Sequence, residues 1–239
     1  MTAMARAVLT TTAAAALLAG TAAPAGAAPV HAADRALASS AVAGHREVGQ
    51  VVTAPLRDAI EELTVAEESR AGYVRTAFKH WVDADHDGCN TRKEVILREA
   101  VEAPEVGPGC TLTGGRWYSI YDGVTVTDAS ALDVDHVVPL AEAWDSGASA
   151  WTAAERQAYA NDLDEPRDLV AVTARSNRQK ADKDIAEWRP IEAEKCDYVA
   201  RWTVSKTRWG QTVDTTEKNV LRDLAATCPN ETLTISLAR

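Results

Sequence analysis

Apolar residues recur at helical spacing near the start of the folded region. Leu56, Ile60 and Leu63 fall at i, i+4 and i+7 behind a proline, which predicts a helix over residues 55–67. A second helix is predicted over residues 69–82, where the aromatic side chains share one face. We expect those aromatic side chains to belong to the core.

The middle of the chain changes to short runs typical of strands. The runs 117–121 and 124–127 flank Asp122-Gly123, a strong hairpin signal. Thr152 and Glu155 form a capping-box pattern that opens a helix. The remaining predicted elements are strands at 132–138 and 169–173 and helices at 176–186, 190–206 and 215–226. This order predicts an α+β fold with a small sheet and more helix than strand.

The N-terminal residues have the pattern of a secretory signal. Arg6 is the only charge in residues 1–27, an apolar run covers 7–20, and Ala25-Gly26-Ala27 matches a cleavage site. The apolar run is shorter than the roughly 20 residues that span a bilayer. We therefore expect a secreted, extracellular protein without a membrane span. Residues 28–50 are predicted to be a flexible leader, and residues 51–239 a single domain.

The balance of acidic and basic residues limits the possible classes of function. The chain has 239 residues, with 25 Lys and Arg against 35 Asp and Glu. Removing residues 1–27 removes Arg6 and no acidic residue, which leaves 24 basic and 35 acidic residues and a net charge of −11. This excludes a protein that coats nucleic acid by bulk charge, but it allows a small basic site.

All four cysteines lie after the predicted signal, and an even number in an exported chain favours two disulfides. Three pairings are open, and proximity in sequence favours Cys89–Cys110 with Cys196–Cys228. A zinc site is disfavoured because there is no C-x-x-C pair.

The segment 132–140 concentrates chemistry at the end of a predicted strand. Alternation places Asp133 and Asp135 on one face and His136 on the other. A carboxylate can then hold a metal while the imidazole faces a substrate; the alternative is a structural D-x-D-H segment. A second strand begins after Asp168 and leads into a helix near Asn177. The two strands and this helix predict a ββα unit, in which residues 139–167 form a long connection between the strands.

These residues resemble the HNH endonucleases of the ββα-metal type. The resemblance rests on D-V-D-H-V-V-P-L at 133–140, D-L-V at 168–170 and S-N-R-Q-K-A-D-K-D at 176–184. The chain is also similar to secreted actinobacterial HNH proteins that share D-H-V-V-P-L-A-E-A-W-D-S-G-A, here residues 135–148. The HNH core covers about 130–190, and the closer likeness extends over most of the mature chain.

The resemblance implies a role for each matching residue. Asp135 is similar to the metal-binding residue beside the catalytic histidine, and His136 to the general base. Asn177 matches the second metal ligand on the helix. Asp168 occupies the middle position, which is usually Asn and orients the base, so Asp departs from the family pattern here.

The chemistry of these side chains agrees with phosphodiester hydrolysis. A divalent cation on oxygen ligands neutralises charge in the transition state and at the leaving oxygen. Carboxylate and amide oxygens favour Mg²⁺ or Mn²⁺ over Zn²⁺. An imidazole with an ordinary pKa near 6.5 can accept a proton from water at neutral pH. Glu142 is a weaker candidate for extending this acidic site.

A basic stretch follows on the predicted helix. Four side chains are candidates for contacts with nucleic-acid phosphates: Arg175, Arg178, Lys180 and Lys183. The alternative is an ordinary solvated helix face. No residue here suggests reading of base edges, so little sequence specificity is expected. The expected substrate is DNA, with RNA as a second candidate, and we expect a monomer.

A second metal site is suggested by residues 83–94. Asp83, Asp85, Asp87 and Glu94, with Gly88 at the sixth position, match the twelve-residue EF-hand calcium loop. Asn90 at the eighth position and a cysteine at the seventh depart from that loop. The alternative is an acidic turn clamped by Cys89–Cys110.

Two classes of function remain at this stage. The first is a secreted, metal-dependent endonuclease with His136 as general base. The second is an extracellular calcium-binding module without catalytic activity. A peptidase is disfavoured because the chain has neither H-E-x-x-H nor a serine-centred elbow.

Overall fold

The computed structural model describes residues 47–239. The predicted signal at 1–27 lies outside the described residues, as does all but the end of the predicted leader at 28–50. The described end of that leader belongs to the folded part, because the Gly49 amide donates to the Leu237 carbonyl at 2.7 Å.

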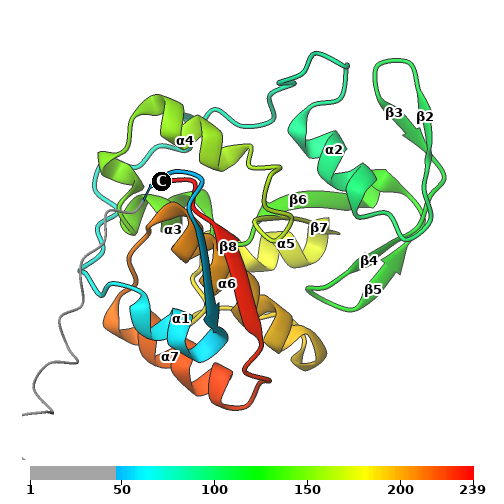
Figure 1. Cartoon of the computed structure of the whole chain (residues 1–239). Coiled ribbons are helices and arrows are strands. Elements are labelled where there is room, and N and C mark those ends of the chain that lie inside the picture. The colour runs from blue at the N-terminus through cyan, green and yellow to red at the C-terminus, as the bar shows by residue number, and fades with distance from the viewer. Residues whose placement is uncertain (1–46) are drawn as a thin grey trace, which may run out of the picture. The chain divides into compact units, whose positions relative to one another are not determined.

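The described residues form an α+β fold, as the sequence predicts (Figure 1). The α-helices are α1 (Leu56–Glu62), α2 (Thr91–Arg98), α3 (Leu140–Asp145), α4 (Ala153–Ala160), α5 (Ala174–Lys180), α6 (Lys195–Trp209) and α7 (Thr215–Ala226). The strands are β1 (Val51–Pro55), β2 (Glu105–Gly107), β3 (Thr111–Thr113), β4 (Trp117–Ser119), β5 (Val124–Val126), β6 (Leu132–His136), β7 (Leu169–Thr173) and β8 (Thr232–Ser236). The strands pair antiparallel as β1-β8, β2-β3, β4-β5 and β6-β7.

The pair β6-β7 separates two parts of the core. Leu132, Val134 and Ala171 pack in the smaller hydrophobic cluster, which includes the apolar face of α2. Val170 and Val172, on the other face of β7, pack in the larger cluster that contains the side chains of α1, α6 and α7. Every residue of β7 is therefore buried, which explains its continuous apolar run. Helix α5 follows β7 and contacts both strands, so the predicted ββα arrangement is present.

The N-terminal and C-terminal strands close the fold next to the α1, α6 and α7 helices. Figure 1 shows β1 and β8 lying side by side although they come from opposite ends of the described chain. The disulfide Cys196–Cys228 joins the start of α6 to the residues that follow α7. Both predicted disulfides, this one and Cys89–Cys110, are confirmed.

The largest difference from the sequence prediction is residues 69–82. They contain only a short 3₁₀ turn at Arg75–Ala77 instead of a helix. Gly72 and Trp81 have positive φ angles of 76° and 61°, which a right-handed helix does not allow. Phe78 is nevertheless fully buried, so the aromatic residues were correctly placed near the core. The predicted helices at 55–67, 176–186 and 190–206 also have shorter or shifted limits.

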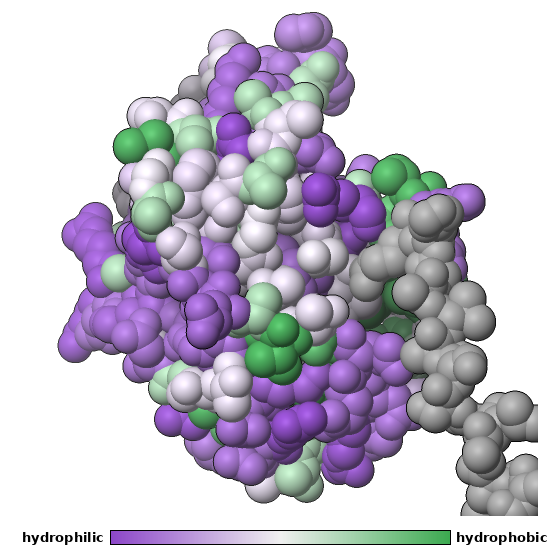
Figure 2. Space-filling model, turned by 90° about the vertical axis from the view of Figure 1, so that its left-hand side faces the viewer, coloured by the Kyte–Doolittle hydropathy of each residue, from purple (hydrophilic) through white to green (hydrophobic). Residues whose placement is uncertain are grey.

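The surface is mainly polar on one face of the molecule (Figure 2). Figure 2 shows that hydrophilic residues predominate on this face and that hydrophobic residues occur in small patches. Among the described residues, none of the helices has the length and apolar character needed to cross a bilayer.

Candidate active site

Strand β6 presents acidic side chains on one face and a histidine on the other, as the alternation predicts. Asp133 and Asp135 are partly buried, whereas His136 is 4% exposed. The antiparallel register places Asp135 opposite Val170 and His136 opposite Leu169. The carboxylates face α5, since Asp133 and Asp135 are bonded to side chains of that helix. The imidazole lies on the strand face that carries Leu132 and Val134.

The His136 ring is held in one orientation by its neighbours. Nε2 lies 3.0 Å from the carbonyl oxygen of Ala160. Because a carbonyl only accepts hydrogen bonds, Nε2 carries the proton and Nδ1 is the basic nitrogen of the neutral ring. The ring stacks on Trp81 and Tyr159, with centroid distances of 5.5 Å and 6.0 Å.

The surroundings of His136 keep it neutral. Burial lowers the pKa of the imidazole to about 3, the Ala160 carbonyl opposes this shift, and the positive charges of Arg75, His80 and Lys180 add to it. The ring is therefore uncharged at neutral pH, with Nδ1 unprotonated. Its lowered pKa makes it a weaker base than the ordinary imidazole expected from the sequence. Arg75 is an exposed residue of the 3₁₀ turn. Its charge acts on both His136 and Asp135, and no sequence pattern predicts this placement.

Asp135 forms an ion pair with a lysine from α5. Its Oδ2 accepts hydrogen bonds from Lys180 Nζ at 2.6 Å and from the Tyr121 hydroxyl at 2.7 Å. Burial raises the pKa of Asp135, and the Lys180 charge opposes that shift. Lys180 is fully buried and also donates to the backbone oxygen of His136 at 3.0 Å. The prediction that Lys180 contacts nucleic acid is therefore wrong, because its ammonium group faces inward.

The other predicted residues of α5, and Lys183 just after it, lie in different surroundings. Asn177, one turn before Lys180, donates from Nδ2 to Asp133 Oδ2 at 3.2 Å, so its Oδ1 is the atom suited to a cation. Arg175, Arg178 and Lys183 are exposed, as a role in phosphate binding requires.

Asp168 does not contact the His136 ring through its side chain. Its Oδ2 accepts from Trp209 Nε1 at 3.2 Å, and its backbone oxygen accepts from the amide of Val137 at 2.9 Å. Burial, followed by the charges of Asp162 and Glu165, raises the pKa of Asp168 well above its ordinary value. The Arg208 charge opposes this shift. The Ala160 carbonyl, not the Asp168 side chain, binds the His136 ring.

Glu142 lies in a different cluster from Asp135. Its Oε1 accepts from Lys206 Nζ at 2.6 Å, within a buried group that also contains Glu217. Oxygens of Glu68, Glu142 and Glu217 lie within 4.8 Å of one another. Glu142 therefore does not extend the acidic face of β6.

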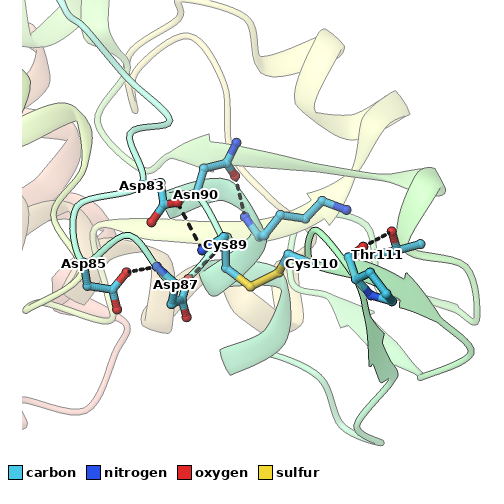
Figure 3. The surroundings of a disulfide bond; sticks show 10 residues. Asp83, Asp85, Asp87, Cys89, Asn90, Cys110 and Thr111 are labelled. Atoms are coloured by element: carbon cyan, nitrogen blue, oxygen red, sulfur yellow. Dashed lines mark hydrogen bonds between the residues drawn. A yellow bond between two sulfur atoms is a disulfide. The ribbon is translucent and has the colours of Figure 1, made fainter.

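The predicted calcium loop brings its three aspartates together beside the Cys89–Cys110 disulfide (Figure 3). Their oxygens lie within 4.8 Å of one another, and Asp83 Oδ1 is buried without a hydrogen-bond partner. Gly88, with φ of 94°, donates to Asp83 Oδ2 at 3.1 Å. Burial and then the three aspartates raise the pKa of Glu94, so this carboxyl also lies near the cluster. Asn90 departs from the EF-hand pattern because it caps α2 by accepting from the Lys93 amide.

Sequence reasoning missed the neighbours that orient His136. Trp81 lies in a segment whose pattern predicts a helix, and Ala160 acts through a backbone carbonyl that every residue type carries. Asn161 forms four hydrogen bonds around these two residues, and no local sequence signal marks this role.

The fold and this site define an α+β protein with a ββα unit that carries carboxylates and an oriented, neutral histidine. Residues 83–224 match the family of GmrSD restriction endonucleases, C-terminal domain. Since the match covers more than half of the chain, the protein belongs to this family, and this membership supports a nuclease. An "Uncharacterized secreted protein" from Arthroderma benhamiae is 41% identical over 158 residues, which cover 66% of this chain and 76% of the relative. No solved structure matches the chain.

Proposed function

We propose that the protein is a secreted, metal-dependent endonuclease of the HNH type that hydrolyses phosphodiester bonds in DNA or RNA with little sequence specificity. The observation that carries this proposal is His136, which is neutral and fixed with a basic Nδ1 at the end of a strand rich in carboxylates. Family membership supports the reaction class. The name of the A. benhamiae relative and the two disulfides support secretion.

In the proposed mechanism, Nδ1 of His136 removes a proton from the attacking water. The hydroxide forms a bond to phosphorus, the bond from phosphorus to the 3′-oxygen breaks, and that oxygen takes a proton from solvent water. His136 then returns its proton to solvent. Asp135 and Asn177 would hold Mg²⁺ or Mn²⁺, which supplies charge neutralisation at the phosphate when bound. Both hydrogen bonds to Asp135 use Oδ2, so Oδ1 is the atom suited to the cation. Arg175, Arg178 and Lys183 would contact flanking phosphates.

Plasmid cleavage by the purified protein tests this mechanism. We expect cleavage with Mg²⁺ or Mn²⁺ and loss of cleavage with EDTA. His136→Ala should lower the rate by about 10²- to 10⁴-fold, since it removes the general base. His86→Asn is the matched control, because His86 is exposed and has a positive φ that Asn tolerates. Cleavage that persists in EDTA, or in a folded His136→Ala variant, would contradict the proposal.

We also propose that the loop from Asp83 to Glu94 binds Ca²⁺. The converging carboxylates and the unpartnered Asp83 Oδ1 support this site. If the chain binds Ca²⁺ in a titration but cleaves no nucleic acid with any divalent cation, the calcium-binding module becomes the better description.

A further inference from the structure

Asn161 uses the full hydrogen-bonding capacity of its side-chain amide. Its Oδ1 accepts from the Val82 amide at 3.0 Å and from Thr91 Oγ1 at 2.9 Å. Its Nδ2 donates to the carbonyl oxygens of Lys79 at 2.8 Å and Gln157 at 2.7 Å. The amide therefore has a partner at each of its two donor and two acceptor positions, and the single Thr91 hydroxyl hydrogen is shared with the Val82 carbonyl oxygen, which is also 2.9 Å away.

Two of these bonds hold a strained segment at both ends. Lys79 and Val82 enclose His80-Trp81, and Trp81 has a φ of 61°, which is uncommon for a bulky residue. The Trp81 ring stacks on His136 with an interplanar angle of 29°. A left-handed tryptophan persists only where its surroundings impose it, and the bonds from Asn161 lie on either side of it.

The remaining bonds fix the chain that carries the carbonyl bound to His136. Asn161 is the C-cap residue of α4 and directly follows Ala160, whose oxygen lies 3.0 Å from His136 Nε2. Its bond to Gln157 ties it to the last turn of α4, and its bond to Thr91 ties it to the start of α2. The residue therefore joins two of the groups that touch the imidazole, the Trp81 ring and the Ala160 carbonyl.

We propose that Asn161 is a positioning residue that fixes the orientation and tautomer of His136 through Trp81 and Ala160. Its effect on catalysis rests on the proposed function, in which His136 Nδ1 is the base. Its effect on the ring does not depend on any activity.

The test that does not depend on activity is NMR of ¹⁵N-histidine-labelled protein at constant pH. The His136 signals are assigned by their loss in His136→Gln. In the parent protein we expect one neutral tautomer with the proton on Nε2. In Asn161→Ala we expect a mixture of the two neutral tautomers, because the carbonyl is no longer fixed. Asn219→Ala, an exposed substitution on α7, should leave the parent spectrum unchanged.

Kinetics on DNA give the second readout. Asn161→Ala should lower kcat by about tenfold or more with KM changed less than about twofold, since a misplaced base slows chemistry without removing substrate contacts. If Asn161→Ala does not fold, Asn161→Asp decides, because it keeps both acceptor bonds and loses the bonds donated to Lys79 and Gln157.

The outcomes separate the two proposals. A parent protein that cleaves neither DNA nor RNA, combined with mixed His136 tautomers in the Asn161 variant, supports the positioning role and contradicts the nuclease. A parent that cleaves DNA, combined with an unchanged tautomer and unchanged kcat in a folded Asn161 variant, overturns the positioning role alone.

Discussion

Lys180 and Asp135 show how burial changes the meaning of a charged residue. Burial moves the pKa of the carboxyl upward and that of the ammonium downward, whereas their mutual attraction opposes both shifts. The Tyr121 hydroxyl and the His136 carbonyl complete the hydrogen bonding of the pair. Lys180, which the sequence pattern assigns to a basic surface, is therefore an internal counter-ion for Asp135 on β6.

Removing one member of this pair should be costly. Lys180→Met leaves the Asp135 carboxylate buried without its partner, and we expect the free energy of unfolding to fall by about 3–5 kcal/mol. The double variant Lys180→Met with Asp135→Asn should lose less than the sum of the two single variants. Urea unfolding measures each value.

Lys183→Met provides the control for Lys180. Its side chain is exposed on the same stretch of chain, and the change should stay within about 0.5 kcal/mol. Strict additivity of the two substitutions in the ion pair would mean that Lys180 and Asp135 do not interact.

At the scale of helices and strands, the sequence predicted the elements whose signals lie within a few neighbouring residues. The limits of β7 and α7, the β4-β5 hairpin and the capping box of α4 were all correct, because each depends on neighbouring residues. Residues 69–82 were not, because tertiary contacts hold Trp81 in a left-handed conformation. The pairing of β1 with β8 and the carbonyl of Ala160 against His136 join distant segments and leave no local pattern.

The acidic loop and α2 provide a prediction at this scale. If the loop binds Ca²⁺, the ion should raise the free energy of unfolding by about 2.7 kcal/mol at a concentration one hundred times the Kd. Asp85→Asn should reduce this gain, because it removes a charged ligand and keeps an oxygen that can accept from the Asp87 amide. Urea unfolding with and without Ca²⁺ measures the difference.

Glu105→Gln controls for the loss of one exposed carboxylate away from the loop. Equal stabilisation of the parent and Asp85→Asn by Ca²⁺ would place the ion elsewhere.

At the scale of the whole molecule, a buried charge cluster joins α3, α6 and α7 to the segment after α1. Lys206 donates to Glu142 Oε1 and Ser146 Oγ, each at 2.6 Å, and lies 3.1 Å from Glu217. Burial and then Glu142 raise the pKa of Glu68 to about 8, with Glu217 and Asp214 adding to the shift and Lys206 opposing it. Burial also raises the pKa of Glu217. The single ammonium group of Lys206 lies among three carboxyl groups, so proton binding by these carboxyl groups is favoured.

This cluster should make stability depend on pH. A carboxyl whose pKa is higher in the folded state binds protons more tightly when the chain is folded. Its contribution to the free energy of unfolding is therefore complete below the unfolded-state pKa and is lost as the pH rises through the folded-state pKa. For Glu68 the window runs from 4.5 to about 8. Glu68→Gln should flatten the decline of unfolding free energy across this window and be more stable than the parent at pH 8.

Urea unfolding at a series of pH values measures the slope. Glu67→Gln, an exposed neighbour, should follow the parent curve. Parallel curves for the parent and Glu68→Gln would exclude Glu68 as the source of the slope.

The pairing of β1 with β8 determines how the chain responds to a pulling force. Val51 pairs with Ser236 and Pro55 with Thr232, so residues 47 and 239 leave the ladder at the same end. Tension applied to these residues loads the hydrogen bonds one at a time, and the strands unzip rather than slide.

Peeling of the C-terminal strand then stops at Cys228, which is bonded to Cys196. The two disulfides enclose separations of 21 and 32 residues, which shortens the stretched chain by about 180 Å at ~3.3–3.6 Å per residue. Force therefore detaches the outer strands first and leaves the ββα unit to a later stage of extension.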